Sequence, residues 1–311
     1  MINLLPTLQS ELQSDQDSCY CSTFQMAWDS LRDLLNLDII DTTDHKFVKD
    51  LNTIRFPTDI LNDKDYIARA GNYLETVGII EQEMMNKFGE VTVNLRGNIA
   101  DLISFSYLYK DLKFKEKFNL FKEPLYFNDK PVKSFGFKDR VLNDITVYEH
   151  VDRYSVEIPL EDDVMYITQL SHENTLKDLV WSAQELRKFG NKIPYWSINK
   201  LEVPCLNLGL LKRYLEVCGN VKNMKEVTLT DAIQMVKFKL NEVGAILESY
   251  ALIGCSYCGF PGFRNLKLGI TFDSPFLIEI YSKKDVEEKD PYFVSYFNTT
   301  ECMEIMENLN V

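Results

Sequence analysis

Two stretches toward the C-terminal end carry the clearest hydrophobic patterns in the sequence. Residues 236–240 alternate apolar and charged side chains, which is typical of a strand with one buried face. Residues 275–281 are almost all apolar, which favours a strand buried on both faces. Residues 245–267, which lie between them, follow neither period. Because loops of this length inside a domain are usually functional or disordered, we expect a long exposed loop here.

Helical and strand periods are mixed along the rest of the chain. Apolar residues recur at helical spacing in residues 22–37, 79–88, 175–189 and 208–217. Alternating or continuous apolar runs predict strands at residues 66–75, 99–108, 154–160, 164–167, 201–204 and 268–272. Asn128 and Asp129, followed by Pro131, predict a tight turn. Helices early in the chain and many strands later indicate an α+β fold with large antiparallel sheets.

The composition is that of an ordinary globular protein. The 311 residues are 45% hydrophobic and 26% charged, and this length is sufficient for one domain with a sizeable core. No internal repeat or segment of biased composition divides the chain, so we treat residues 1–311 as a single domain. The net charge of -13 is spread over the sequence, and it makes nucleic acid and anionic membranes poor partners.

The N-terminus and the cysteines bear on the compartment. Residues 1–6 lack the basic and apolar regions of a signal peptide, and no run approaches the roughly 18 apolar residues of a membrane span. The seven cysteines are Cys19, Cys21, Cys205, Cys218, Cys255, Cys258 and Cys302. An odd number of cysteines in a large domain without an export signal predicts reduced thiols in the cytoplasm.

Seven segments resemble segments of the serpin family, in serpin order. They are residues 102–118, 127–135, 154–168, 201–204, 231–244, 272–278 and 292–297. The first contains an apolar strand followed by Phe114 and Phe118, similar to the serpin strand that precedes a spaced Trp and Phe. The fifth is similar to the strand and hinge before the serpin reactive loop, and Pro275 begins a stretch similar to the Pro-Phe-Leu run after it. The resemblance is clearest over residues 66–298.

The resemblance implies a serpin-like α+β fold, in which helices pack on large, mostly antiparallel sheets and a long loop is exposed. It also implies that residues 99–108 and 231–240 share the main sheet. Residues 89–98 are too few for the helix that crosses this sheet in serpins, so we expect that helix to be missing or vestigial. Residues 299–311 have no serpin counterpart, and we expect a C-terminal helix over residues 301–309.

In inhibitory serpins a protease cleaves the loop, which then inserts into the main sheet as a new strand. The resemblance assigns the hinge of this movement to Glu242, Gly244, Ala245 and Leu247. With Gly244 as the hinge glycine, the inward positions are Ala245, Leu247, Ser249 and Ala251. Inward side chains must be small because a packed interior tolerates extra volume poorly, and Leu247 is the bulky exception. We therefore expect a non-inhibitory binding or interaction module, with a protease inhibitor as the alternative.

The residue at which a protease would cut has two candidates. Counting forward from Gly244 with serpin spacing gives Cys258, and counting back from Pro275 gives Arg264. The two counts differ because this loop is longer than the serpin loop. Arg264 would suit a trypsin-like protease, which binds a cationic side chain with a buried carboxylate. The expected partner is thus a protease or another protein bound through residues 245–267, and we expect a monomer.

The cysteines suggest two further chemistries. Cys255 and Cys258 form a Cys-x-x-Cys pair, and Cys19 and Cys21 form a Cys-x-Cys pair. Together they could offer four thiolates to zinc, and the first pair alone could be a redox dithiol. The pairs are far apart in the sequence and no βαβ pattern surrounds the first, so we expect partly buried free thiols instead.

No motif in the sequence points to enzymatic catalysis. The three histidines, His45, His150 and His172, do not have the spacing of metal ligands. Nucleophile elbows, phosphate-binding loops and dinucleotide fingerprints are absent from the sequence. We therefore expect no metal, no cofactor and no enzymatic activity. A thiol-dependent enzyme is the third hypothesis.

Overall fold

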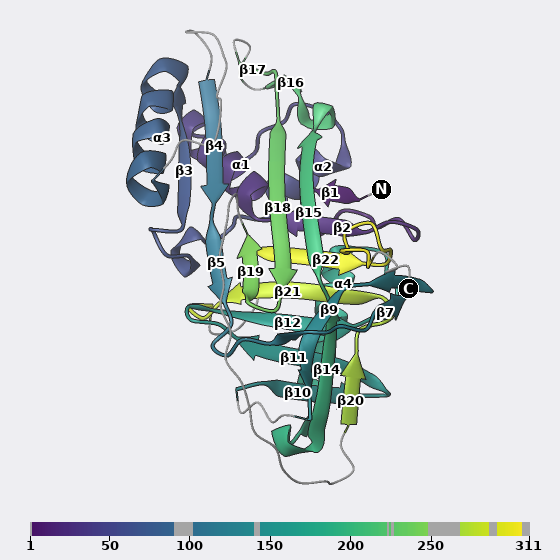
Figure 1. Ribbon diagram of the computed structural model, residues 1–311. Coiled ribbons are helices and arrows are strands. Elements are labelled where there is room, and N and C mark those ends of the chain that lie inside the picture. The colour runs from purple at the N-terminus through teal and green to yellow at the C-terminus, as the bar shows by residue number, and fades with distance from the viewer. Residues whose placement is uncertain are drawn as a thin grey trace. The chain divides into compact units, whose positions relative to one another are not determined.

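The computed structural model describes residues 2–89, 102–139, 144–222, 224, 227–247, 268–285 and 291–306. The chain divides into two compact units, whose elements are labelled in Figure 1. The large unit comprises Met1–Tyr20, Asp111–Gly209 and Lys237–Val311. The small unit comprises Cys21–Lys110 and Leu210–Val236.

Two helices and a two-stranded ribbon pack together in the small unit. Helices α1 (Thr23–Leu35) and α3 (Tyr73–Phe88) pack against the antiparallel strands β3 (Tyr66–Asn72) and β4 (Leu102–Leu108). The buried side chains of this cluster are Ile67, Ile80 and Met84. Helix α3 starts at Tyr73, within residues 66–75, which we predicted to be a strand.

The other elements of the small unit are short. They are α2 (Lys46–Thr53), η1 (Thr58–Ile60), η3 (Leu215–Val217), β16 (Gly219–Asn220) and β17 (Thr228–Leu229). Helix α2 was not predicted, and it buries only Val48 and Leu51. An apolar stripe this narrow gives a weak periodic signal.

An eight-stranded sheet is the centre of the large unit. Its strands, in spatial order, are β1 (Asn3–Leu5), β2 (Ser18–Cys21), β22 (Phe293–Phe297), β21 (Phe276–Ser282), β12 (Asp163–Gln169), β11 (Arg153–Pro159), β10 (Thr146–His150) and β13 (Asn191–Ile193). The pair β1–β2 is parallel, and β22 to β13 are joined by antiparallel pairs. Every residue of β21 and β22 is buried, as expected for strands in the middle of a covered sheet.

Helix α4 (Leu176–Phe189) packs on this sheet through its apolar face. Thr175 and Asp178 form a capping box at its first turn. The Arg187 guanidinium binds both carboxylate oxygens of Glu279 on β21, at 2.6 and 3.2 Å, and both side chains are almost fully buried. The Tyr281 hydroxyl donates to Glu279 at 2.6 Å. These contacts fix the position of α4 on the sheet.

A second sheet has the order β20 (Leu268–Thr271), β14 (Ile198–Pro204), β9 (Ser134–Lys138) and β6 (Asn119–Leu120). Strand β20 is parallel to β14, whereas the other pairs are antiparallel. Gly136 of β9 has φ +155°, and a Cβ there would lie 1.8 Å from the Leu201 carbonyl oxygen. The close approach of β14 therefore requires glycine at this position.

Beside this sheet, a hairpin joins β7 (Leu125–Phe127) to β8 (Lys130–Val132). Asn128 and Asp129 form the predicted turn, and both have positive φ. The short strand β13 is followed by η2 (Tyr195–Ser197).

A third sheet has the order β15 (Leu206–Arg213), β18 (Ile233–Asn241), β19 (Gly244–Leu247) and β5 (Lys110–Lys113) (Figure 1). We predicted a helix over residues 208–217, and this prediction was wrong for Leu206–Arg213. Burial in β15 follows a strand period, because Leu206 and Leu208 are buried while Asn207 and Gly209 are exposed. Leu210 and Leu211 made the segment resemble a helix, but Leu211 is exposed.

The predicted sharing of one sheet by residues 99–108 and 231–240 was wrong in detail. β4 pairs only with β3 in the sheets of the described residues, and its continuation, β5, belongs to the third sheet with β18. Tyr109 separates β4 from β5, and its backbone N–H donates to the Asp65 carbonyl at 2.8 Å. Residues 99–101 lie outside the described residues.

The C-terminal helix predicted over residues 301–309 does not form in the described residues 301–306. Met303 and Ile305 instead make isolated bridges to Leu206 and Val132, so this segment is extended and paired with other strands. Gly89 ends α3, and the expected missing or vestigial helix falls on residues 90–98, which lie outside the described residues. Across the described ranges, no helix is both long and apolar enough to span a membrane.

Candidate functional site: the hinge hairpin

The segment assigned to the hinge forms a tight hairpin between β18 and β19. Asn241 pairs with Gly244 and Phe238 with Leu247, so only Glu242 and Val243 form the turn. The Val243 backbone N–H donates to the Asn241 side-chain oxygen at 3.0 Å, which closes the turn. In the third sheet, β19 lies between β18 and β5, and the start of the long loop is thus a strand.

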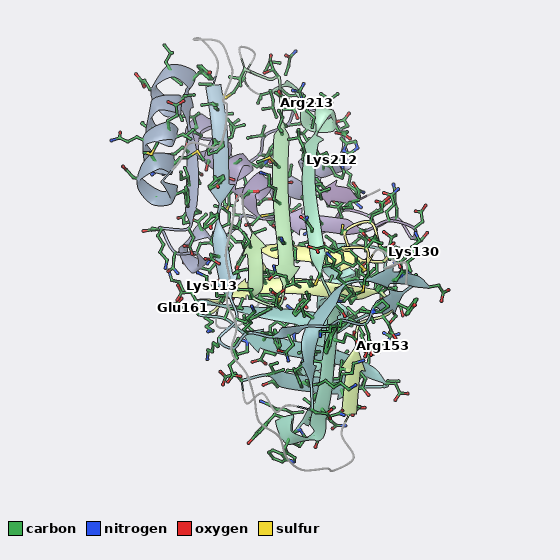
Figure 2. The ribbon with its side chains drawn as sticks, in the orientation of Figure 1. Lys113, Lys130, Arg153, Glu161, Lys212 and Arg213 are labelled. Carbon is green, nitrogen blue, oxygen red and sulfur yellow. The ribbon has the colours of Figure 1, made fainter. Side chains whose placement is uncertain are left out.

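Gly244 lies close to the neighbouring strand β5. Its φ is +155°, and a Cβ at this position would lie 2.4 Å from the Leu112 carbonyl oxygen and 2.9 Å from the Lys113 Cα. Lys113, labelled in Figure 2, is the last residue of β5. Because these contacts are with backbone atoms, a side chain cannot be accommodated by a change of rotamer. Glycine is required here for steric reasons.

The turn is held by the segment that follows β5. The backbone N–H groups of Phe114 and Phe118 donate to the carbonyls of Val243 and Glu242, at 3.2 and 2.9 Å. The Lys117 ammonium lies 3.8 Å from a Glu242 carboxylate oxygen. The sequence resemblance pointed to Phe114 and Phe118, but it gave no signal for Lys117 or for the backbone of Leu112.

Aromatic stacking connects this segment to the second sheet. The rings of Phe114 and Phe118 lie 4.7 Å apart, centre to centre. They lie 6.0 and 5.8 Å from the ring of Phe135, and Phe118 also lies 6.4 Å from Phe137. Phe135 and Phe137 belong to β9. The hinge turn is therefore supported through Phe114 and Phe118 by the aromatic side chains of β9.

Side chains in β19 alternate between the interior and a partly exposed face. Ala245 is 1% exposed and Leu247 is 3% exposed, whereas Ile246 is only partly buried. The interior therefore accommodates Leu247, the bulky residue of the hinge. The proposed role of Glu242, Gly244, Ala245 and Leu247 in a loop movement remains a prediction.

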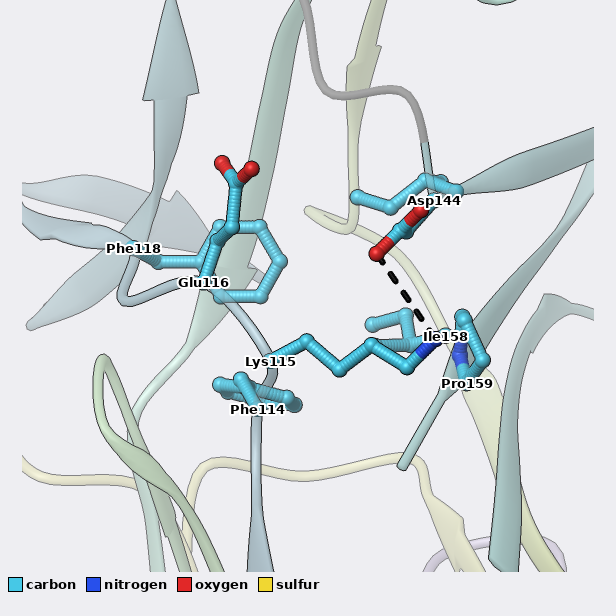
Figure 3. Close-up of a pocket in the computed structure, with 8 residues that line it drawn as sticks. Phe114, Lys115, Glu116, Phe118, Asp144, Ile158 and Pro159 are labelled. Carbon is cyan, nitrogen blue, oxygen red and sulfur yellow. Dashed lines mark ion pairs between the residues drawn. The ribbon is translucent and has the colours of Figure 1, made fainter. Parts of the chain in front are cut away.

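A small hollow lies beside Phe114 and Phe118 (Figure 3). Its volume is about 290 Å³, including open solvent. The lining residues are Phe114, Lys115, Glu116, Phe118, Asp144, Ile145, Ile158 and Pro159. At its mouth, Lys115 and Asp144 form an ion pair at 3.7 Å. Ligand pockets usually have about 300–1,000 Å³ of enclosed space, so this hollow is too open and small for an organic ligand.

The remaining candidate residues are cysteines and Arg264. Cys255 and both candidate cleavage residues, Cys258 and Arg264, lie outside the described residues. Within the described part of the chain, no cluster of three or more Cys, His, Asp or Glu side chains could hold a metal. Cys19 and Cys21 are buried in β2.

Burial raises the pKa of several described thiols and so favours their protonated form. It raises the pKa of the Cys21 thiol, and burial with the nearby Glu304 and Glu242 charges raises the pKa of Cys205 to about 12. Burial and the charge of Asp17 raise the pKa of Cys302 as well. Because the thiolate is the nucleophilic form, these three thiols are poor nucleophiles.

Comparison with solved structures identifies the fold. Thyroxine-binding globulin in its complex with thyroxine is similar, with a TM-score of 0.50 at 10% identity over 91% of this chain and 92% of that chain. Serpin48 of the insect Tenebrio molitor has a TM-score of 0.47 at 13% identity over 88% of each chain. Human glycosylated kallistatin has a TM-score of 0.47 at 12% identity over 91% of each chain.

The chain has a divergent serpin-like α+β fold, with helices packed on mostly antiparallel sheets. It is shorter than typical serpins. No protein-family model matches the sequence, and no curated protein matches it significantly. Identities this low establish the fold alone.

Proposed function

We propose that this protein is a non-inhibitory binding module of serpin-like fold that contacts a protein partner through residues 245–267. The observation that supports this proposal is the position of β19. Gly244–Leu247 is already paired with β18 and lies between β18 and β5. In an inhibitor that position is filled after cleavage, and its filling supplies the driving force for trapping the protease. Because insertion has already begun here, further insertion would release less free energy.

The second candidate function is protease inhibition by loop cleavage and further insertion. It is favoured by the burial of Leu247, which is 3% exposed although it is the bulky residue of the hinge. The expected obstacle to insertion is thus absent at this position. Arg264 and Cys258 remain the two predicted cleavage residues.

Non-enzymatic action is part of the proposal, and so is a reducing compartment such as the cytoplasm. Cys21, Cys205, Cys218 and Cys302 are free thiols, and raised pKa values make Cys21, Cys205 and Cys302 poor nucleophiles. These features favour a binding role over thiol chemistry, and one similar solved structure is thyroxine-binding globulin in complex with thyroxine.

The test is incubation with trypsin-like and papain-like proteases, followed by denaturing gels and thermal unfolding of the cleaved product. We expect cleavage within residues 251–267, no covalent complex that survives denaturation, and little change in melting temperature. A denaturation-stable complex together with a large rise in melting temperature would replace the proposal with the inhibitor. The matched variants Arg264→Ala and Cys258→Ala identify the cleaved bond, because only the correct one protects the loop.

A further inference from the structure

The C-terminal segment Cys302–Met306 fills a fork between two neighbouring strands of the large unit. Strands β9 and β14 pair as far as Ser134 and Pro204. Beyond that pair the two strands separate. Strand β14 leads on to β15, whereas β9 is preceded by β8. The C-terminal segment lies between them, because Met303 bridges to Leu206 and Ile305 to Val132. Residues 299–311 were the part of the sequence without a serpin counterpart.

Backbone hydrogen bonds hold this segment on both sides. On one side, the Asn207 N–H donates to the Cys302 carbonyl at 2.8 Å, and the Glu304 N–H donates to the Cys205 carbonyl at 3.0 Å. On the other side, the Lys133 N–H donates to the Glu304 carbonyl at 2.7 Å. The Met306 N–H also donates to the Pro131 carbonyl, at 3.1 Å. The segment is therefore paired with both branches of the fork.

Asp17 anchors the chain just before the fork. Its carboxylate accepts the backbone N–H groups of Asn298 and Thr299, at 2.8 and 2.7 Å, and the Thr299 hydroxyl at 3.0 Å. The Cys302 thiol also hydrogen-bonds to this carboxylate. Cys302 and Met303 are buried, whereas Ile305 is 49% exposed. The anchored end is thus buried, and the distal end reaches the surface.

The fork and the hinge share the same supporting core. The hinge turn is bonded to Phe114 and Phe118, and both rings pack against Phe135 of β9. Ser134, the residue before Phe135, ends the pairing of β9 with β14 at the fork. Cys205, bonded to Glu304, also lies within electrostatic range of Glu242 in the hinge turn. One residue of β9 and two aromatic rings therefore connect the fork to the hinge turn.

We propose that Cys302–Met306 is a latch that stabilises the inserted position of β19, so that release of the latch loosens the hinge hairpin. The inference rests on the proposed function only in taking Gly244–Leu247 as the start of the functional loop. Latch and hairpin would form one coupled element with two arrangements, closed and released. Coupling between such positions is reciprocal by thermodynamic necessity.

The forward test is hydrogen exchange in the uncleaved full-length protein. Glu304→Pro removes the N–H that binds the Cys205 carbonyl and the ion pair with Lys133, which spans 3.2 Å. The control is Glu304→Gln, which keeps the backbone bond. We expect exchange of residues 237–247 to rise roughly tenfold in Glu304→Pro and to change little in the control. Faster exchange confined to residues 131–133 and 205–207 would overturn the latch and leave the segment as packing.

The reverse test decides the question independently if Glu304→Pro does not fold. Gly244→Ala places a Cβ 2.4 Å from the Leu112 carbonyl oxygen, which should expel β19. The alkylation rate of Cys302, followed by mass spectrometry, should then rise roughly tenfold. The control is Ala183→Gly, a destabilising change at a buried position of α4 that is not in the fork. Equal alkylation of Cys302 in both variants would contradict the coupling.

Both tests use no protease, so their outcome is separate from that of the proposed function. An inhibitor could have a latch, and a binding module could lack one. A denaturation-stable protease complex together with coupled exchange would therefore reject the module and retain the latch. Uncoupled exchange without a stable protease complex would retain the module and reject the latch.

Discussion

Truncation of Leu247 tests whether the start of the loop contributes to the stability of the folded protein. Leu247 is 3% exposed in β19, where it pairs with Phe238 of β18. Leu→Ala changes in a protein core cost about 2–5 kcal/mol, depending on how far the surroundings collapse. Because Leu247 is the last residue of a four-residue strand, collapse should be easier than in a central strand. We therefore expect the lower part of that range, about 2–3 kcal/mol.

The assay is equilibrium unfolding in urea, followed by circular dichroism, with Leu247→Ala beside the wild type. In a parallel thermal melt of this 311-residue chain, unfolding cooperatively, the same loss of stability should lower the melting temperature by about 3–5 °C. The matched control is Ile246→Ala, because Ile246 is adjacent but only partly buried. A loop that is not inserted would leave Leu247 in solvent. A Leu247→Ala stability within about 0.5 kcal/mol of the wild type would therefore refute the insertion of β19.

Three other predictions concern stability. Arg187→Met should cost about 3–5 kcal/mol in urea unfolding because Glu279 is then buried without its partner, and the double variant with Glu279→Leu should recover most of this loss; an equally unstable double variant would contradict this account. Burial raises the pKa of Asp17, so the folded state disfavours its ionised form. The wild type should therefore gain stability relative to Asp17→Asn as the pH falls from neutral toward 3.8, the ordinary pKa of an aspartate. A loss of relative stability over that range in denaturation curves would contradict this account. Gly136→Ala should cost at least about 2 kcal/mol because its Cβ would lie 1.8 Å from a carbonyl oxygen, whereas Gly209→Ala, whose Cβ meets nothing within 4 Å, should be nearly neutral in thermal melting; similar melting temperatures would count against the steric argument.

Elements with strong local signals were predictable from the sequence. Strands β11 and β12 match the strands predicted over residues 154–160 and 164–167, although Asp163 already belongs to β12. Helix α4 has its predicted end before Gly190, and its cap is the predicted first residue, Thr175. In these cases the turn or cap chemistry and the burial period lie within a few neighbouring residues. The hinge strand was also visible, because apolar and charged residues alternate strictly over residues 236–240.

Features that depend on distant partners were not predictable. The segment over residues 301–306 has helical spacing but is extended, because its backbone partners come from residues 131–133 and 205–207. The Arg187–Glu279 pair joins residues 92 positions apart, and no local pattern marks either of them. In the hinge, the need for glycine comes from the backbone of Leu112, which no sequence period records. Tertiary contacts decided each of these cases.

The position of β20 and β21, the strands that follow residues 248–267, has a practical consequence. Strand β19 belongs to the third sheet and β20, the next described strand, belongs to the second, after which the chain enters β21 between β12 and β22. After a single cut before Leu268, the C-terminal peptide would thus stay bound, because β21 remains paired with β12 and β22 in the eight-stranded sheet. Nicked material should elute from a sizing column at the volume of intact protein and separate into two bands only when boiled in detergent.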